Sequence, residues 1–168
     1  MDTSESTLYE RTVILHESRN DNPLQKAVVF IHGGAWVDKR NTPHDFDHLS
    51  KTILSLTNGI LSFAMYGIEY RLSPGVKHPT HVNDVIENLG KLIKEKGITQ
   101  LHLVGHSVGA TLAWQTATAV NTSKQPSGNL EIVQSCLRGI YLVDGIFSLS
   151  ELLNEYPDYI GFVSQAFS

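Results

Sequence analysis

The sequence predicts an α/β protein with a doubly wound, mainly parallel sheet. Short apolar runs alternate with segments of helical periodicity, in the order β-α-β-α-β-α-β-α. The run at residues 27–31 is continuous and rich in β-branched side chains, as a strand buried on both faces should be. With 168 residues, of which 41% are hydrophobic, the chain can bury one substantial core. We therefore expect a single domain over residues 1–168.

The first half of the chain contains three expected strands and one expected helix. A short strand is predicted at residues 13–15, before the strand at 27–31. Thr42 followed by proline is typical of a helix start, and residues 58–59, Asn-Gly, should end that helix. Alternating apolar residues at 61, 63 and 65 indicate the next strand.

The second half continues the alternation. Helices are expected at residues 82–93, 110–120 and 148–156, strands at 101–104 and 139–143 (the latter buried), and a polar loop at 121–129. Gly97 should end the first of these helices. Ser148, with Glu151 three positions later, predicts a capping box at the start of the last helix.

Composition excludes several classes of function. Thirteen basic and 17 acidic residues give a net charge of −4 without a basic block, which argues against a nucleic-acid partner. No run reaches the length of a membrane span, and residues 1–20 do not have the pattern of a signal peptide. The single cysteine, Cys136, suits a reducing compartment. No metal or cofactor motif is present. We therefore expect a soluble, cytoplasmic protein.

The pattern Gly105-x-Ser107-x-Gly109 lies between an expected strand and an expected helix. A sharp strand-to-helix turn needs glycine where backbones approach closely, and it lifts the serine hydroxyl above the sheet. The alternative is a chance match or a purely structural turn. The position between strand and helix favours a nucleophilic serine.

A second glycine motif, HGGAW at residues 32–36, follows the first confident strand. Consecutive glycines let backbone N–H groups face a substrate oxygen, as an oxyanion hole requires. The alternative is an ordinary glycine turn in which His32 and Trp36 only pack. The serine motif downstream favours the oxyanion hole, and Trp36 and Tyr70 are candidates for an aromatic wall.

These motifs, with YRLSP at residues 70–74, resemble the α/β-hydrolase superfamily, on its lipase and esterase branch. Together with LVDGIFSLSELL at 142–153, they resemble more narrowly the fungal kynurenine formamidases, or arylformamidases. The resemblance covers about residues 26–168. It implies a small-molecule substrate, N-formyl-L-kynurenine, which is hydrolysed to L-kynurenine and formate in tryptophan degradation towards NAD.

The resemblance also implies roles for individual residues. Ser107 matches the nucleophile, and the backbone N–H groups of the oxyanion hole match Gly34, Ala35 and Val108. In this motif His32 orients the loop and is not the catalytic base. The motif as a whole comprises His32, Gly33, Gly34, Ala35 and Trp36.

All eight histidines lie at or before His106, whereas the resembled family places its catalytic acid and then its histidine after the serine. Asp144 ends an expected strand and is interpreted as a local residue. No upstream histidine is interpreted as the catalytic base. We expect His44 and His48 on a solvated helix face, His78 and His81 as capping or surface residues, and His102 as a core residue whose hydrogen bonds are satisfied. His106 should point away from the serine.

The sequence is therefore interpreted as the first part of a hydrolase domain whose C-terminal strands are missing, through truncation, frameshift or an incomplete gene. Little or no turnover is expected from it. Two alternatives stay open: an esterase or lipase of the same fold, and a catalytically dead α/β module that binds a ligand or partner.

Overall fold

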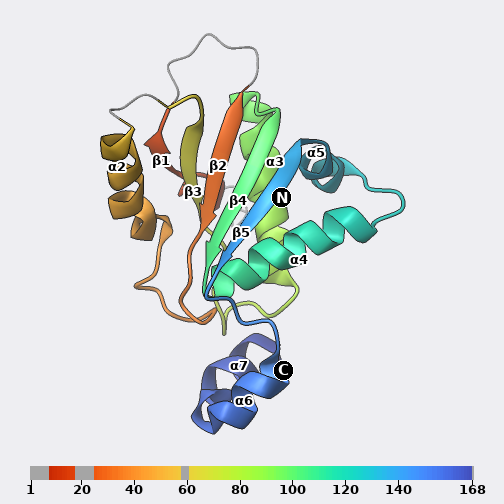
Figure 1. Ribbon diagram of the computed structural model, residues 1–168. Helices are drawn as coiled ribbons and strands as arrows, with labels where there is room; N and C mark the ends of the chain where they lie inside the picture. The colour runs from red at the N-terminus through yellow and green to blue at the C-terminus, as the bar shows by residue number, and fades with distance from the viewer. Residues whose placement is uncertain (1–7, 18–24, 58–60, 168) are drawn as a thin grey trace.

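The computed structural model describes residues 8–17, 25–57 and 61–167, and a five-stranded sheet lies at its centre (Figure 1). The strands follow the order β1-β3-β2-β4-β5 across the sheet. Their bounds are β1 Val13–His16, β2 Lys26–Ile31, β3 Ala64–Ile68, β4 Gln100–His106 and β5 Leu137–Val143. The central strand β2 pairs in parallel with both β3 and β4, and β4 pairs in parallel with β5. Only β1 is antiparallel to its neighbour, β3.

Helices flank the sheet on both faces, which confirms the doubly wound α/β class. Their bounds are η1 Pro43–Phe46, α2 Asp47–Leu56, α3 Thr80–Lys96, α4 Val108–Thr122, α5 Gly128–Cys136, α6 Leu149–Glu155, η2 Pro157–Tyr159 and α7 Ile160–Phe167. One face is covered by α3, α4 and α5, and α2 lies against the other. In Figure 1, α6 and α7 form a separate layer beyond the carboxyl ends of the strands. None of the helices in the described ranges is both long and apolar enough to cross a membrane.

Most of the core lies between the sheet and α3, α4 and α5. Alternate residues of the strands point into it, including Val29 from β2, Tyr66 from β3 and Leu103 from β4. The intervening residues Phe30 and Met65 point to the opposite face, where they form a smaller cluster with residues of η1 and α2. The sheet therefore has a thickly covered face and a thinly covered one.

Local sequence signals correctly predicted several boundaries. The side chain of Thr42 accepts a hydrogen bond from the backbone N–H of His44 at 3.3 Å, and the Asp45 carboxylate accepts one from the Thr42 N–H at 3.2 Å. Gly97 ends α3 with a φ of 63°. Ser148 caps α6 by accepting from the Glu151 N–H at 3.3 Å. The predicted stop at residues 58–59 lies outside the described residues.

Three predictions about elements were wrong. The strand expected from residue 61 begins at Ala64. The polar loop expected at residues 121–129 ends early because α5 begins at Gly128, and no local sequence signal predicted this helix. The strand expected to be buried, β5, leaves Tyr141, Leu142 and Val143 exposed, because it lies at the sheet edge and α2 does not reach over it.

Candidate active site

Ser107 lies in the sharp turn between β4 and α4, with backbone angles of φ 54° and ψ −125°. The chain is packed closely around it. A Cβ atom added to Gly105 would lie 2.2 Å from the carbonyl oxygen of Gly109, and one added to Gly109 would lie 2.0 Å from that of Ile31. Only glycine fits at these two positions. The G-x-S-x-G pattern therefore has the steric basis of a nucleophile elbow.

The end of β5 holds this elbow in place. The Ser107 N–H donates to the Val143 carbonyl at 2.9 Å, and the Ser107 carbonyl accepts from the Ala110 N–H at 2.9 Å. The N–H of Val108, at the start of α4, has no acceptor among the described residues, as is usual in the first turn of a helix. The described residues also give the Ser107 hydroxyl no hydrogen-bond partner.

The loop after β2 lies directly against the elbow. A Cβ atom on Gly33 would lie 3.2 Å from the Ser107 Cβ atom. The next three residues, Gly34, Ala35 and Trp36, have φ angles of 101°, 51° and 62°. Within the described ranges, the N–H groups of Gly34 and Ala35 have no acceptor. This chain path leaves unpaired amides beside the serine, which is the arrangement that stabilises a developing oxyanion.

The side chain of His32 holds the loop at residues 32–36 in place. Its ring is fully buried, stacks on Tyr70 with centroids 4.5 Å apart, and makes hydrogen bonds through both nitrogens. Nε2 lies 2.8 Å from Glu69 Oε1, and Nδ1 lies 2.9 Å from the carbonyl oxygen of Gly33. Because both nitrogens are occupied, the ring is unavailable to Ser107 as a base.

Residues after β3 complete the support of the loop. Glu69 also accepts from the Tyr70 N–H at 3.2 Å, and Asn88 donates to the Glu69 carbonyl at 2.8 Å. The Tyr70 hydroxyl donates to the Gly33 carbonyl at 2.9 Å, and burial raises the pKa of that hydroxyl. Sequence reasoning missed Glu69 and Asn88, although Glu69 directly precedes the YRLSP motif that it had singled out.

The predicted aromatic wall was wrong. Trp36 is fully buried and packs edge-on against Phe167, with centroids 4.9 Å apart. Tyr70 is buried beneath the oxyanion loop. Both rings pack against the buried side of the loop at residues 32–36, so neither is available to contact a substrate.

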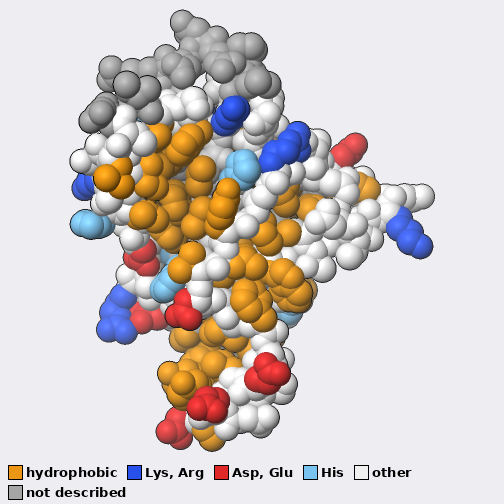
Figure 2. All heavy atoms as spheres, in the orientation of Figure 1, with side chains coloured by type: hydrophobic (Ala, Val, Ile, Leu, Met, Phe, Trp, Pro, Cys, Tyr) orange, Lys and Arg blue, Asp and Glu red, His pale blue; other side chains and the backbone are white. Residues whose placement is uncertain are grey.

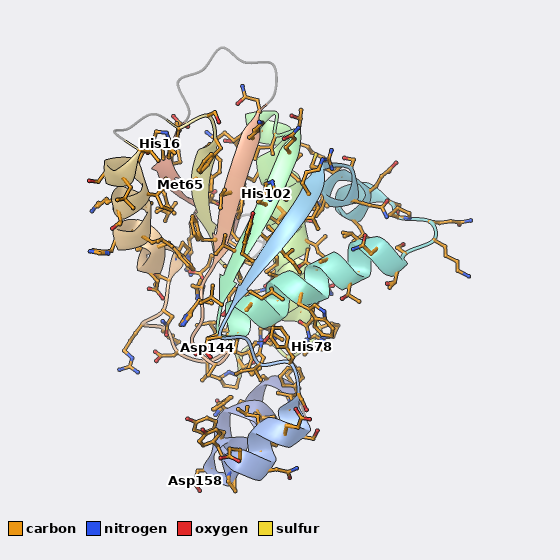
Figure 3. All side chains as sticks on the ribbon, in the orientation of Figure 1. His16, Met65, His78, His102, Asp144 and Asp158 are labelled. Carbon is orange, nitrogen blue, oxygen red and sulfur yellow. The ribbon has the colours of Figure 1, made fainter. Side chains whose placement is uncertain are left out.

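A cleft of about 570 Å³ opens beside Ser107, between the elbow and the layer of α6 and η2. Its lining combines the serine with two carboxylates and two aromatic rings, and consists of Ser107, Asp144, Gly145, Ile146, Phe147, Ser148, Glu151, Leu152 and Tyr159. Figure 3 shows Asp144 at the end of β5, at the junction with this layer, and Asp158 at its far side. Asp144, interpreted from sequence as a local residue, thus shares a cleft with the nucleophile.

The histidines beside the elbow and on α2 do not complete a catalytic or metal site. The His106 ring lies beside Gly33 and makes no hydrogen bond to Ser107. His44 pairs with Asp47 at 3.3 Å on the surface. Across residues 8–17, 25–57 and 61–167, no group of three or more potential metal ligands occurs.

Two predictions about other histidines were wrong. His81 is fully buried, and its Nε2 lies 3.1 Å from Ser73 Oγ, so it is not a surface residue. Burial, with a smaller contribution from His78, lowers the pKa of His81 to about 4. His102 is not a satisfied core residue, because its Nδ1 has no partner among the described residues.

Comparisons with known proteins agree with this geometry. A profile of the alpha/beta hydrolase fold matches residues 28–155. The kynurenine formamidase of Eremothecium gossypii is 47% identical over 165 residues, which cover 95% of this chain and 65% of that protein. The kynurenine formamidase of Saccharomyces cerevisiae is 40% identical, over 96% of this chain and 62% of that protein. The chain thus spans less than two thirds of the length of these relatives.

Solved structures match in fold. An esterase from the archaeon Pyrobaculum calidifontis superposes with a TM-score of 0.62 at 19% identity, over 98% of this chain and 60% of that chain. A putative thioesterase from a Silicibacter species gives a TM-score of 0.59 at 17% identity, over 97% of this chain and 63% of that chain. At these identities the likeness concerns the fold alone.

Proposed function

The chain belongs to the α/β-hydrolase family, and from that premise we propose that its site is that of a serine hydrolase which cleaves N-formyl-L-kynurenine to L-kynurenine and formate. The observation that carries the proposal is the contact between the loop at residues 32–36 and Ser107, which sets unpaired amides beside a serine hydroxyl. Similarity to the kynurenine formamidases supports the choice of substrate.

The reaction would proceed by acyl transfer. Ser107 Oγ attacks the formyl carbon while a general base takes the hydroxyl proton, and the N–H groups of Gly34, Ala35 and Val108 bind the resulting oxyanion. The C–N bond then breaks, and the arylamine leaves with a proton. Water attacks the formyl-serine ester and releases formate. Loss of one oxyanion donor typically costs about 10²–10³ in rate.

The general base is the part that this chain's described residues do not supply. No histidine follows His106 in the sequence, and His32 is held at both nitrogens. Serine is a weak nucleophile without a base. We therefore expect slow turnover from the 168-residue chain, well below that of a kynurenine formamidase such as the one from Eremothecium gossypii.

Chemical rescue tests the proposal. Free imidazole can act as an external base, so adding it to the chain with N-formyl-L-kynurenine should increase kynurenine release, measured by fluorescence. Ser107→Ala should abolish the increase, because the oxygen that attacks the formyl carbon is gone. Equal release by the two proteins, with imidazole present, would remove Ser107 from the reaction and overturn the proposal.

A second candidate is the hydrolysis of carboxylic esters, favoured by the fold that the chain shares with esterases. A panel of p-nitrophenyl esters, measured beside N-formyl-L-kynurenine, separates the two activities. A third is a binding module without catalysis, favoured because the described residues place no general base beside Ser107. Such a module would bind kynurenine without Ser107-dependent turnover. In each case a cytoplasmic location is supported by the single cysteine, which is free and buried.

A further inference from the structure

The strand β5 has one open edge. It is the last strand of the sheet, and β4 is its neighbour on the inner side. The Val143 carbonyl accepts a hydrogen bond from the Ser107 N–H, so the backbone groups of Val143 face the β4 side. Successive residues of a strand direct these groups to opposite sides, so those of Ile140 and Leu142 face outward. Among the described residues they have no hydrogen-bond partner. This edge is therefore a template for pairing with another strand.

The side chains along the open edge are apolar. Tyr141 and Val143 lie on the thinly covered face of the sheet, where Tyr141 lines an apolar groove beside Val104. Leu142 lies on the opposite face, and all three residues of 141–143 are exposed. Figure 2 shows the hydrophobic side chains that gather along this side of the molecule. Proteins usually protect an edge strand with a charged side chain or a proline, and residues 139–143 contain neither.

Charged residues of opposite sign lie at the two ends of this apolar stretch. Arg138 precedes it and Asp144 follows it, and both are exposed. The Arg138 guanidinium donates to the carbonyl oxygens of Ser135 at 2.9 Å and of Leu137 at 3.1 Å. In the described part of the chain, neither Arg138 nor Asp144 forms a salt bridge. Both charges are therefore available to a partner of opposite charge.

The spacing of the two charges makes the edge complementary to itself. Arg138 and Asp144 lie at equal separations before and after Tyr141. In an antiparallel pair of β5 strands with a two-fold axis at Tyr141, Arg138 of each copy lies opposite Asp144 of the other. The same register sets Ile140 opposite Leu142, so their outward backbone groups meet. A parallel pair in register would set like charges opposite each other, which is destabilising.

An unsatisfied side-chain atom lies beside the same edge. His102 Nδ1 is buried and has no partner among the described residues. A Cβ atom added to Gly139 would lie 3.0 Å from this nitrogen, so the ring lies over the one β5 residue without a side chain. Buried polar atoms in folded proteins are nearly always paired. The orphaned nitrogen therefore also indicates that the surface over β5 is covered in the assembled protein.

We propose that this edge binds a second copy of the chain, with two β5 strands paired antiparallel about a two-fold axis at Tyr141. The pair joins the two sheets into one, forms an Arg138–Asp144 ion pair at each end, and brings the two Tyr141 rings together over the grooves. It also supports the candidate site, because the Val143 carbonyl that holds the Ser107 N–H belongs to the paired strand. Self-association does not depend on the chemistry at Ser107.

Sedimentation velocity on the 168-residue chain tests for the pair. Between about 1 and 100 μM the average mass should rise from that of a monomer to that of a dimer, by mass action. It should then stop rising, because a two-fold contact uses the same edge of both copies and is closed. A chain that stays monomeric over this range, or that assembles without limit, would overturn the proposal.

Cysteine cross-linking tests the register. In the proposed pair, residue 141 faces its own copy at a position without backbone hydrogen bonds, where side chains approach most closely. Tyr141→Cys should therefore form a disulfide-linked dimer under mild oxidation. Leu142→Cys is the matched control: it faces Ile140 of the second copy, so its yield should be several-fold lower. The native chain, whose Cys136 is buried, gives the background. Equal yields from the two variants would mean random contact and contradict the register.

Exchange of the two charges tests the ion pairs. Arg138→Asp and Asp144→Arg should each raise the Kd of the dimer about ten-fold, because like charges then lie opposite each other at both ends. The double variant restores opposite signs and should return the Kd to within about three-fold of the native value. Lys51→Glu reverses an exposed charge on α2, away from β5 in Figure 1, and should leave the Kd unchanged.

Circular dichroism checks that each variant is folded. A double variant that associates as weakly as the single ones would contradict the charge pairing. A different occupant has its own signature: the chain would stay monomeric and bind the separately expressed part of the Eremothecium gossypii kynurenine formamidase that it does not match. That result would assign the edge to such a segment and overturn the pairing of two copies.

Discussion

On one face of the sheet, α3, α4 and α5 join the strands in a cluster that contains Leu103, Leu89 and Leu112, all fully buried. On the other face, η1 and α2 cover part of the sheet, and an apolar groove of about 550 Å³ remains along β2, β4 and β5. Figure 2 shows the hydrophobic side chains that gather there beside α2. The two faces of the same strands are thus expected to contribute differently to stability, because the burial of each side chain depends on the helices that cover it.

The largest expected effect is on the covered face. Leu103→Ala removes a fully buried side chain from the centre of β4 and leaves a cavity that surrounding helices cannot fill. It should lower the free energy of unfolding by about 2–5 kcal/mol. Urea denaturation measures this value. A loss below about 1 kcal/mol would show that the covered face is as loosely packed as the other.

The buried histidine His81, on α3, provides the second test. The pKa of His81 is lowered to about 4 by burial, so the folded state binds fewer protons than the unfolded state between about pH 6.5 and 4. The contribution of neutral His81 to the free energy of unfolding is therefore complete above about pH 6.5. As the pH falls towards 4, roughly 2–3 kcal/mol of that free energy is lost.

The variant His81→Gln checks that contribution. Glutamine can still donate a hydrogen bond to Ser73, but it does not titrate. Urea midpoints between pH 7.5 and 4.5 should fall less steeply for the variant than for the wild type. Parallel curves would assign the acid sensitivity to other groups.

The thinly covered face should respond less. Val104 is adjacent to Leu103 in β4 but lines the groove, where it is only partly buried. Val104→Ala should cost about 1 kcal/mol or less in the same denaturation experiment, because less apolar surface is returned to water. The pair of variants compares the two faces within one strand, and equal losses would contradict the proposed difference.

The smallest change in stability is expected at the groove's outer edge. Tyr141 on β5 is 57% exposed. Tyr141→Lys should change the free energy of unfolding by no more than about 0.5 kcal/mol, as is usual for surface positions. The added charge should reduce self-association through the sheet edge, which light scattering over a concentration series measures. Unchanged scattering would mean that this edge does not drive association.

Sequence reasoning succeeded where the signal was local. The elbow glycines, the Thr42 cap and the Gly97 stop each depend on neighbours within a few residues, so their patterns could be recognised. The helix α5 as a whole was missed because it ends at Cys136 and β5 begins at the next residue, without a turn signal between them.

The rest of the site depends on contacts between distant segments. Glu69 meets His32 across 37 positions of sequence, and the cleft brings Asp144 to Ser107 through the pairing of β4 with β5. The exposure of β5 was also unpredictable, because an apolar run does not indicate which helix will cover it. Single-sequence patterns contain no information on these pairings.

The backbone angles of the site have a consequence for protein engineering. In the described ranges, the non-glycine residues with positive φ are Ala35, Trp36, Ser107 and Asp144, all near the carboxyl ends of β2, β4 and β5. Each such conformation costs about 1 kcal/mol or more, and glycine would adopt it without strain. At Trp36 the loss of a fully buried ring would outweigh that gain. A directed-evolution campaign that screened only for heat resistance would therefore favour glycine at Ala35, Ser107 and Asp144, and the nucleophile would be among the residues it replaced.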